Sequence, residues 1–261
     1  MLFRPACQAE REVFFMNMVE EAVKLIRESE SIVVLTGAGA STESGIPDFR
    51  SNVGPPKKKK YDYPVEVLLS HTFFINNTEI FYDYYMNNMV YRDAKPNDCH
   101  KALAEMEKYC NVLAVITQNI DGLHQDAGSS NVIELHGSTR RNYCMKCGRE
   151  FSLDELLEMN KPVPKCVSCG GVIKPDVVLY EEPLNERDLS RAVELTLKAD
   201  VMLVIGTSLV VYPAAGLLNY YRGNKLIIVN IGSTPFDRSA RIVIHDNAGK
   251  VMKKILEGLK A

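Results

Sequence analysis

Several features are missing from this sequence, and each absence narrows its class. No apolar stretch approaches the roughly 18 residues of a membrane-spanning helix, so we expect no membrane partner. Lysine plus arginine (31) almost balance aspartate plus glutamate (33), and the net charge of −2 predicts no direct nucleic-acid binding. The N-terminus is interrupted by Arg4, Glu10 and Arg11 and has no signal-peptide core.

The cysteines do not form the even set of a disulfide-rich secreted protein. There are seven of them, which together with the missing signal peptide favours a cytoplasmic, reducing location. With 261 residues, 46% of them hydrophobic and 25% charged, the chain can bury a sizeable core. We expect one large domain, or one domain that carries a small insertion.

The rest of the chain is organised around residues 31–50, SIVVLTGAGASTESGIPDFR. Ser31–Thr36 is a β-branched run typical of a strand buried on both faces of a parallel sheet. The small residues at 37–41 permit a tight turn and the approach of a phosphate to backbone N–H groups. The next glycine, Gly45, comes too late for the usual GxGxxG spacing. A phosphate-binding loop is favoured, and a glycine-rich turn without a ligand is the alternative.

Helical and strand patterns alternate along most of the chain. Short buried-type runs predict strands at 31–36, 112–117, 132–135, 201–205 and 226–229. Periodic apolar residues and capping signals predict helices at 12–29, 64–92, 96–109, 185–199 and 248–259. This alternation predicts an α/β fold, with a mainly parallel sheet and helices on both faces.

Polar residues follow four of the predicted strands, at the edge where open α/β sheets bind ligands. These clusters are residues 118–124 (QNIDGLH), 136–138 (HGS), 206–208 (GTS) and 230–232 (NIG). We expect the functional site along that edge. The aromatic residues of 64–92 are expected in the core, and Lys57–Lys60 in a solvated loop rather than an anion site.

Four of the cysteines form a spaced quartet, Cys144, Cys147, Cys166 and Cys169. Two C-x2-C pairs separated by eighteen residues fit a zinc ribbon, and a glycine after each pair permits a sharp turn. Four thiolates leave no position for water, so the predicted zinc ion is structural. Redox-active CxxC pairs are the rival interpretation. Charges of both signs surround the quartet, and this mixture is weak support for a nucleic-acid-binding module. A small metal-binding unit that shapes a cleft is therefore favoured.

Taken together, the motifs closely resemble those of the sirtuin family of NAD-dependent protein lysine deacylases, in its bacterial type. They occur in the family's order: GAGASTESGIPDFR (37–50), TQNIDGLH (117–124), ELHGS (134–138), the two CxxC pairs, PDVV (175–178), GTSLVVYPAA (206–215) and VN (229–230). The resemblance covers the chain from about residue 16 to its end. It implies NAD and one structural zinc ion as bound groups, with acetyl-lysine proteins or peptides as substrates.

The resemblance also implies how the chain is divided. Residues 13–261 would form the catalytic domain, after an N-terminal extension of residues 1–12. Its parts would be a Rossmann-like large domain (about 13–52, 96–140 and 175–261), a helical and cofactor-loop insertion (about 46–95) and a small inserted zinc-ribbon domain (about 141–174). NAD and the peptide would lie between the large and small domains.

Site residues carry over motif by motif. The resemblance implies His136 as the general base, with Asn119 and Asp121 also catalytic. It implies NAD contacts from Ala38, Thr42, Phe49, Arg50, Gln118, Ile120, Asp121, Thr207, Ser208 and Asn230. An unperturbed histidine pKa of about 6.5 suits a base that works near neutral pH. From the residues alone, His136 could equally be a hydrogen-bonded structural histidine.

The implied activity is NAD-dependent removal of acetyl groups from protein lysine side chains, giving deacylated lysine, nicotinamide and 2′-O-acetyl-ADP-ribose. Two enzymatic alternatives are removal of longer neutral acyl groups and protein mono-ADP-ribosyl transfer. A non-enzymatic alternative is an NAD or ADP-ribose sensor that docks a partner through its zinc ribbon.

The sequence departs from the family pattern at two places that bear on substrate choice. Residues 179–183 read LYEEP where many relatives have Phe-Phe-Gly-Glu, so Tyr180 and Glu181 leave peptide and acyl preference open. Residues 82–85 read YDYY and lack the arginine of relatives that remove succinyl or malonyl groups. A neutral acyl group such as acetyl is therefore expected.

Overall fold

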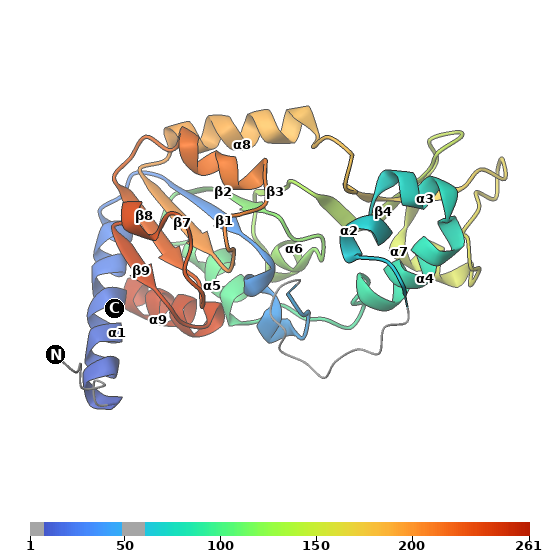
Figure 1. The fold of residues 1–261 in the computed structure, drawn as a ribbon. Coiled ribbons are helices and arrows are strands. Elements are labelled where there is room, and N and C mark those ends of the chain that lie inside the picture. Colours follow the sequence, from blue (N-terminus) through green and yellow to red (C-terminus); the bar gives the residue numbers. More distant parts are fainter. Residues whose placement is uncertain (1–7, 49–60) are drawn as a thin grey trace.

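The computed structural model describes residues 8–48 and 61–261, which form a large and a small unit (Figure 1). The large unit is built on a six-stranded parallel sheet with the order β3-β2-β1-β7-β8-β9. Its strands are β1 (Ile32–Thr36), β2 (Val112–Thr117), β3 (Val132–Glu134), β7 (Val201–Ile205), β8 (Lys225–Val229) and β9 (Ile242–Ile244). This is the order of a Rossmann-type sheet, in which the winding reverses between β1 and β7.

Helices cover both faces of this sheet because its central strands are apolar throughout. Every residue of β1 and β7 is buried. On one face, the core contains residues of α1 (Gln8–Arg27), α5 (Asp98–Met106) and α9 (Ala248–Lys260). On the other face it contains residues of α8 (Glu186–Lys198) and the 3₁₀ helix Ala214–Tyr220. Figure 1 shows α8 above the sheet and α9 below it.

The small unit combines an antiparallel sheet, in the order β5-β4-β6, with short helices. Its strands are β4 (Gly137–Cys144), β5 (Glu150–Ser152) and β6 (Ile173–Val177). Its helices are α2 (Val65–Leu68), α3 (His71–Asn76), α4 (Thr78–Asn88) and α7 (Leu153–Glu158). One hydrophobic cluster includes Phe74 and Phe81 from the helices and Phe151 and Ile173 from the sheet. The helical and cysteine-rich segments therefore share a core.

The chain passes between the two units at the end of β3. In the large unit β2 leads to α6 (Leu123–Ala127), whereas β3 leads through a turn at His136 directly into β4. Beside that turn, the Val178 N–H donates a hydrogen bond to the His136 carbonyl oxygen (3.0 Å). The polar clusters after β2 and β3 thus lie where the units meet. Among the described residues, no helix is both long and apolar enough to cross a membrane.

The five predicted strands and the mainly parallel sheet are confirmed, with each strand end within one residue of its predicted position. The helix predicted over 64–92 is wrong as a single element. It is divided into α2, α3 and α4, because Ser70 caps α3 by accepting a hydrogen bond from the Phe73 N–H (3.1 Å). Six of its seven aromatic residues lie in the core as expected, and the seventh, Tyr91, is half-buried. Lys57–Lys60 lie outside the described residues.

Candidate functional site

Two glycine-rich loops meet at the carboxyl ends of β1 and β7, where the winding of the sheet reverses. The Gly39 N–H donates a hydrogen bond to the Gly206 carbonyl oxygen (2.8 Å). A Cβ atom on Gly206 would lie 2.3 Å from the Ala40 nitrogen, and its φ of +62° also favours glycine. A Cβ atom on Gly37 would lie 2.7 Å from the Thr207 Cβ. These glycines therefore permit the close approach of the two loops, in addition to the turn that the sequence predicts.

Ser41 is the centre of a hydrogen-bond network at this edge. Its Oγ donates to Asp121 Oδ2 (2.7 Å) and accepts from Asn119 Nδ2 (3.0 Å). Asn119 Nδ2 also donates to the Gly37 carbonyl oxygen (3.0 Å), and the Leu123 N–H donates to Asp121 Oδ1 (2.9 Å). A serine from the first loop thus holds together two side chains that the sequence places after β2.

Two buried histidines extend this network toward α5 and α6. His100 Nε2 lies 3.3 Å from Ser41 Oγ, and its Nδ1 accepts from the Asn97 N–H (3.3 Å). The His124 ring centroid is 4.7 Å from that of His100, and His124 Nε2 lies 2.9 Å from Thr36 Oγ1. Burial lowers the pKa of His100 to about 4 and that of His124 to about 3, so both are neutral at pH 7.

His136, in the turn between β3 and β4, is joined to Gln118, which directly follows β2. Its Nδ1 lies 2.9 Å from the Gln118 carbonyl oxygen. A carbonyl oxygen only accepts, so Nδ1 carries the hydrogen and Nε2 has the available lone pair. Burial lowers the pKa of His136 and outweighs the hydrogen bond to Gln118, which raises it. The neutral ring can therefore take up a proton at Nε2.

The other predicted cofactor residues are spread along the same edge. Gln118 Nε2 donates to Thr207 Oγ1 (3.1 Å), which links the clusters after β2 and β7. Ala38 and Thr42 lie in the loop after β1, and half-buried Ser208 lies after β7. Asn230 follows β8. The edge thus presents amide, hydroxyl and backbone groups from several strands.

One predicted cofactor residue, Ile120, also contacts the small unit. The Ile120 side chain packs against the hydrophobic cluster of the small unit, and its carbonyl oxygen accepts from the Thr139 N–H (2.9 Å). Phe49 and Arg50 lie outside the described residues. Ile120 therefore connects the edge to the small unit.

Sequence patterns do not single out Ser41 or His100 as site residues. The position of Ser41, directly after the glycine loop, was the available signal. The 59 residues that separate His100 from Ser41 leave no local signal for their contact. Only the fold brings them together.

The four cysteines of the quartet converge in the small unit. Their sulfur atoms all lie within 4.8 Å of one another, and two pairs are separated by 3.4 and 3.7 Å. A tetrahedral site with Zn–S bonds of about 2.3 Å places its sulfurs about 3.8 Å apart. Gly148 and Gly170, each at positive φ, close the turns after the two pairs as predicted. Cys144, Cys147, Cys166 and Cys169 are thus positioned to bind a zinc ion.

Charged side chains fix the segment that leads from β6 to α8. The buried Lys174 Nζ lies 3.1 Å from Glu182 Oε2, and Glu182 Oε1 lies 2.7 Å from His71 Nδ1 in α3. Glu181 has a φ of +76°, and its carboxylate accepts from the Thr72 N–H (2.9 Å). The segment is therefore attached to both β6 and α3.

Residues 37–213 match the family model described as the Sir2 family. The chain belongs to the Sir2 family. The matched part begins at the glycine loop after β1 and includes Ser41, Asp121, His136 and the cysteine quartet. It ends just beyond the loop after β7.

Curated Sir2 relatives are similar over nearly the whole chain. An NAD-dependent protein deacetylase of Clostridium tetani (strain Massachusetts / E88) is 56% identical over 245 residues, which are 94% of this chain and 99% of that protein. An NAD-dependent protein deacetylase of Clostridium acetobutylicum is 51% identical over 245 residues, which are 94% of this chain and 100% of that protein.

Solved Sir2 structures have the same fold. Sir2 with a deacetylated p53 peptide and 3′-O-acetyl ADP ribose has a TM-score of 0.84 and 39% identity, over 92% of this chain and 97% of that chain. Sir2 with a p53 peptide and NAD+ has a TM-score of 0.80 and 40% identity, over 91% of this chain and 96% of that chain. The expected fold, a Rossmann-like sheet with a zinc-ribbon unit, is confirmed.

Proposed function

We propose that this Sir2 chain removes acetyl groups from protein lysine side chains, with NAD as the co-substrate. Both curated relatives described above are named NAD-dependent protein deacetylase, and one related structure holds a deacetylated peptide with an acetyl ADP ribose. In this chain the main support is the hydrogen bond between His136 Nδ1 and the Gln118 carbonyl oxygen, which leaves the Nε2 lone pair available to accept a proton. The products are deacylated lysine, nicotinamide and 2′-O-acetyl-ADP-ribose.

The donor set at the sheet edge fits NAD. Amide, hydroxyl and carboxylate side chains suit a neutral ring amide and ribose hydroxyls, and the loop at the reversal point suits phosphates. When bound, NAD supplies the ribose that accepts the acyl group and nicotinamide as the leaving group. We assign these contacts to Ala38, Thr42, Phe49, Arg50, Gln118, Ile120, Asp121, Thr207, Ser208 and Asn230.

His136 acts as the general base and takes a ribose hydroxyl proton at Nε2. The Gln118 carbonyl keeps Nδ1 protonated and holds the ring in place. Asp121 and Asn119 orient the nicotinamide ribose, and Ser41 fixes both side chains before the substrate arrives. Because burial lowers the pKa of His136, the base is already neutral at physiological pH.

The zinc site has a structural role in this proposal. Four thiolates complete the tetrahedral coordination of the ion and leave no position for water or substrate. The ion therefore stabilises the small unit and takes no part in catalysis. The acetyl-lysine peptide lies between the two units. All described cysteines are free of disulfides, which fits the cytoplasmic location that we infer.

Replacement of His136 by alanine tests this function. We expect turnover of an acetyl-lysine peptide to fall by about 100-fold or more, because the base is lost. The NAD dissociation constant, measured by calorimetry, should change little because the Ser41 network remains. Unchanged turnover would refute the base assignment, and loss of NAD binding would show that His136 acts in binding instead.

Longer neutral acyl groups are a second candidate, because a related Sir2 structure at a TM-score of 0.81 holds a propionylated peptide. No cation is available from residues 82–85, where Tyr82 and Tyr85 are buried in the core of the small unit. We therefore expect acetyl- and propionyl-lysine peptides to react and a succinyl-lysine peptide to be inert. Equal turnover of the succinyl peptide would contradict the neutral-acyl assignment.

A further inference from the structure

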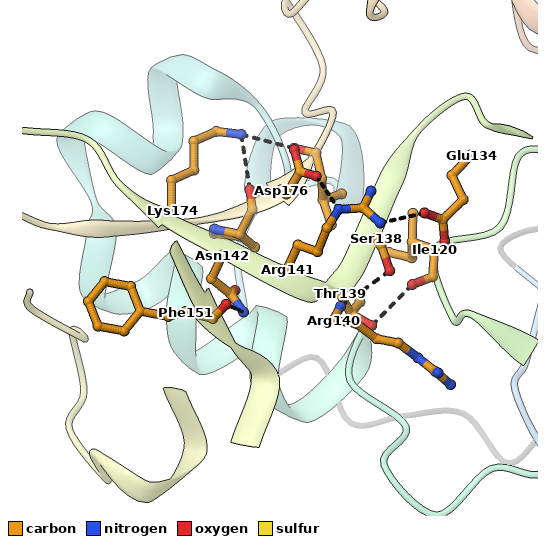
Figure 2. Close-up of polar contacts among 12 residues, drawn as sticks. Ile120, Glu134, Ser138, Thr139, Arg140, Arg141, Asn142, Phe151, Lys174 and Asp176 are labelled. Atoms are coloured by element: carbon orange, nitrogen blue, oxygen red, sulfur yellow. Dashed lines mark hydrogen bonds and ion pairs between the residues drawn. The ribbon is translucent and has the colours of Figure 1, made fainter. Parts of the chain in front are cut away.

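The first residues of β4 are joined to the turn that carries Asp121. The Thr139 N–H and hydroxyl both donate to the Ile120 carbonyl oxygen (2.9 and 3.1 Å). One residue further on, Arg140 Nε donates to the Asp121 carbonyl oxygen (3.2 Å). Figure 2 shows Thr139 beside Ile120, with the Arg140 side chain directed away from that of Arg141. β4 thus holds two consecutive carbonyl groups of this turn.

The Arg140 guanidinium group also binds α6. Its Nη1 donates to Asp126 Oδ1 (2.6 Å), and its Nη2 donates to Asp126 Oδ2. Such two-pronged pairing orients both groups as well as attracting them. Gly122 lies directly against the arginine, because a Cβ atom there would be 2.3 Å from Arg140 Nε. A glycine at the start of α6 is therefore required for Arg140 to reach the turn.

Asp121 is consequently held at three atoms. Its Oδ2 accepts from Ser41 and its Oδ1 accepts from the Leu123 N–H, while its carbonyl oxygen accepts from Arg140. The first two contacts come from the large unit, and only the third comes from a strand of the small unit. Arg140 thus links the backbone of Asp121 to the strand that follows His136.

We propose that Arg140 is a positioning residue for the NAD site. By joining the Asp121 carbonyl group to Asp126, it fixes the direction from which the Asp121 carboxylate meets the nicotinamide ribose. This inference rests on the proposed function, in which Asp121 binds that ribose. Arg140 acts through Asp121 and is not itself a catalytic residue.

The expected size of the effect follows from the exposure of the pair. The side chains of Arg140 and Asp126 are 42% and 39% exposed, so solvent screens their attraction. The contribution to binding therefore comes chiefly from orientation, through the paired geometry and the carbonyl contact. We expect a several-fold effect on NAD affinity rather than a loss of activity.

The test compares Arg140→Met, Arg140→Lys and Asp126→Asn with a matched control, Arg92→Met. Arg92 also forms an exposed ion pair with an aspartate, Asp154 (3.1 Å). Both residues of that pair belong to the small unit, and among the described residues neither forms a hydrogen bond or ion pair with the Asp121 turn. In Arg140→Met the KM for NAD should rise about fivefold, while kcat and the KM for peptide change less than about twofold.

The other variants separate orientation from charge. Arg140→Lys keeps the charge but loses the paired geometry, so it should recover only part of the NAD affinity. Combining Arg140→Met with Asp126→Asn should raise the KM for NAD no further than Arg140→Met alone, because both act through one contact. Fully additive effects would overturn the proposed link through Asp126.

Amide hydrogen exchange of residues 119–123 in the ligand-free protein provides a second readout. Exchange should be faster in Arg140→Met than in Arg92→Met, because the turn has lost an anchor. An unchanged KM for NAD in Arg140→Met, with an active wild-type enzyme, would overturn the positioning role whatever the exchange shows. A wild-type protein that neither binds NAD nor deacetylates would instead refute the proposed function.

Discussion

Replacement of Lys174 by methionine should destabilise the small unit by about 2 to 3 kcal/mol. The lysine side chain is only 4% exposed, and its Nζ lies 3.1 Å from Glu182 Oε2. Nζ also donates to the carbonyl oxygens of Val177 (2.9 Å) and Pro175 (3.3 Å). Methionine fills a similar volume but removes every one of these contacts.

The magnitude follows from what remains around Glu182. Removing one partner of a buried ion pair typically costs about 3 to 5 kcal/mol, because the other charge stays buried without compensation. Here Glu182 is 19% exposed and keeps His71 (2.7 Å) and the Leu179 N–H (2.9 Å) as partners. The cost should therefore fall below the usual range, at about 2 to 3 kcal/mol.

Urea unfolding of Lys174→Met, Glu182→Gln and the double variant measures this cost. Exposed Lys161→Met is the matched control and should stay within about 0.5 kcal/mol of the wild type. The double variant should be no less stable than Lys174→Met, because its buried charge is gone. A change of less than about 0.5 kcal/mol in Lys174→Met would show that the buried ion pair contributes little to stability.

The pH dependence of this difference provides a further check. Burial raises the pKa of Glu182. The Leu179 N–H, His71 and Lys174 together lower it by more, so the pKa lies below its ordinary value. A lowered carboxyl pKa contributes stability above its unfolded value, and this contribution is lost as the pH falls through the folded value. The gap between wild type and Lys174→Met should therefore narrow below about pH 4.

Three further predictions concern the loop contact, the metal and the buried histidines. Gly206→Ala should cost more than about 2 kcal/mol in thermal unfolding, through backbone strain and a clash with the facing loop. Gly128→Ala is the control for backbone strain alone, because Gly128 has a φ of +97° and open space around its Cβ position. An equal loss of stability in Gly206→Ala and Gly128→Ala would contradict the close contact of the two loops. The purified chain should contain a single zinc ion by mass spectrometry. Cys147→Ser should lose it and Cys110→Ser should keep it, whereas retention in Cys147→Ser would refute the four-thiolate site. Because burial lowers the pKa of His124 to about 3, unfolding free energy should decrease as the pH falls below 6.5. In His124→Gln the slope of unfolding free energy against pH should be smaller than in the wild type by up to about 1.4 kcal/mol per pH unit. Equal slopes in the variant and the wild type would contradict a neutral, buried His124.

The parallel sheet could be predicted closely because its strands are continuous apolar runs. β2 and β7 have the predicted bounds, since a strand buried on both faces needs no alternating pattern. β9 (Ile242–Ile244) was not predicted, although β3 has the same length of three residues and was. β4 was missed because its sequence, GSTRRNYC, contains neither an apolar run nor a regular alternation of apolar and polar residues.

The candidate site could be predicted only as far as local motifs extend. The spacing of the cysteine quartet is enough to predict the sulfur cluster, because each C-x2-C pair forms its own turn. The contacts of Ser41 with Asp121 and of Arg140 with the same residue join positions 80 and 19 residues apart. Such contacts depend on how β2, α6 and β4 pack, and no spacing within one segment encodes them.

NAD-dependent deacetylation is tested most directly by a mass-spectrometric assay of an acetyl-lysine peptide with the full chain, with and without NAD. We expect deacetylated peptide, nicotinamide and O-acetyl-ADP-ribose in equal amounts, and only when NAD is present. Deacetylation without NAD would contradict this expectation. Intact acetyl-peptide in the presence of bound NAD, with ADP-ribose transferred to the peptide or not released at all, would equally contradict it.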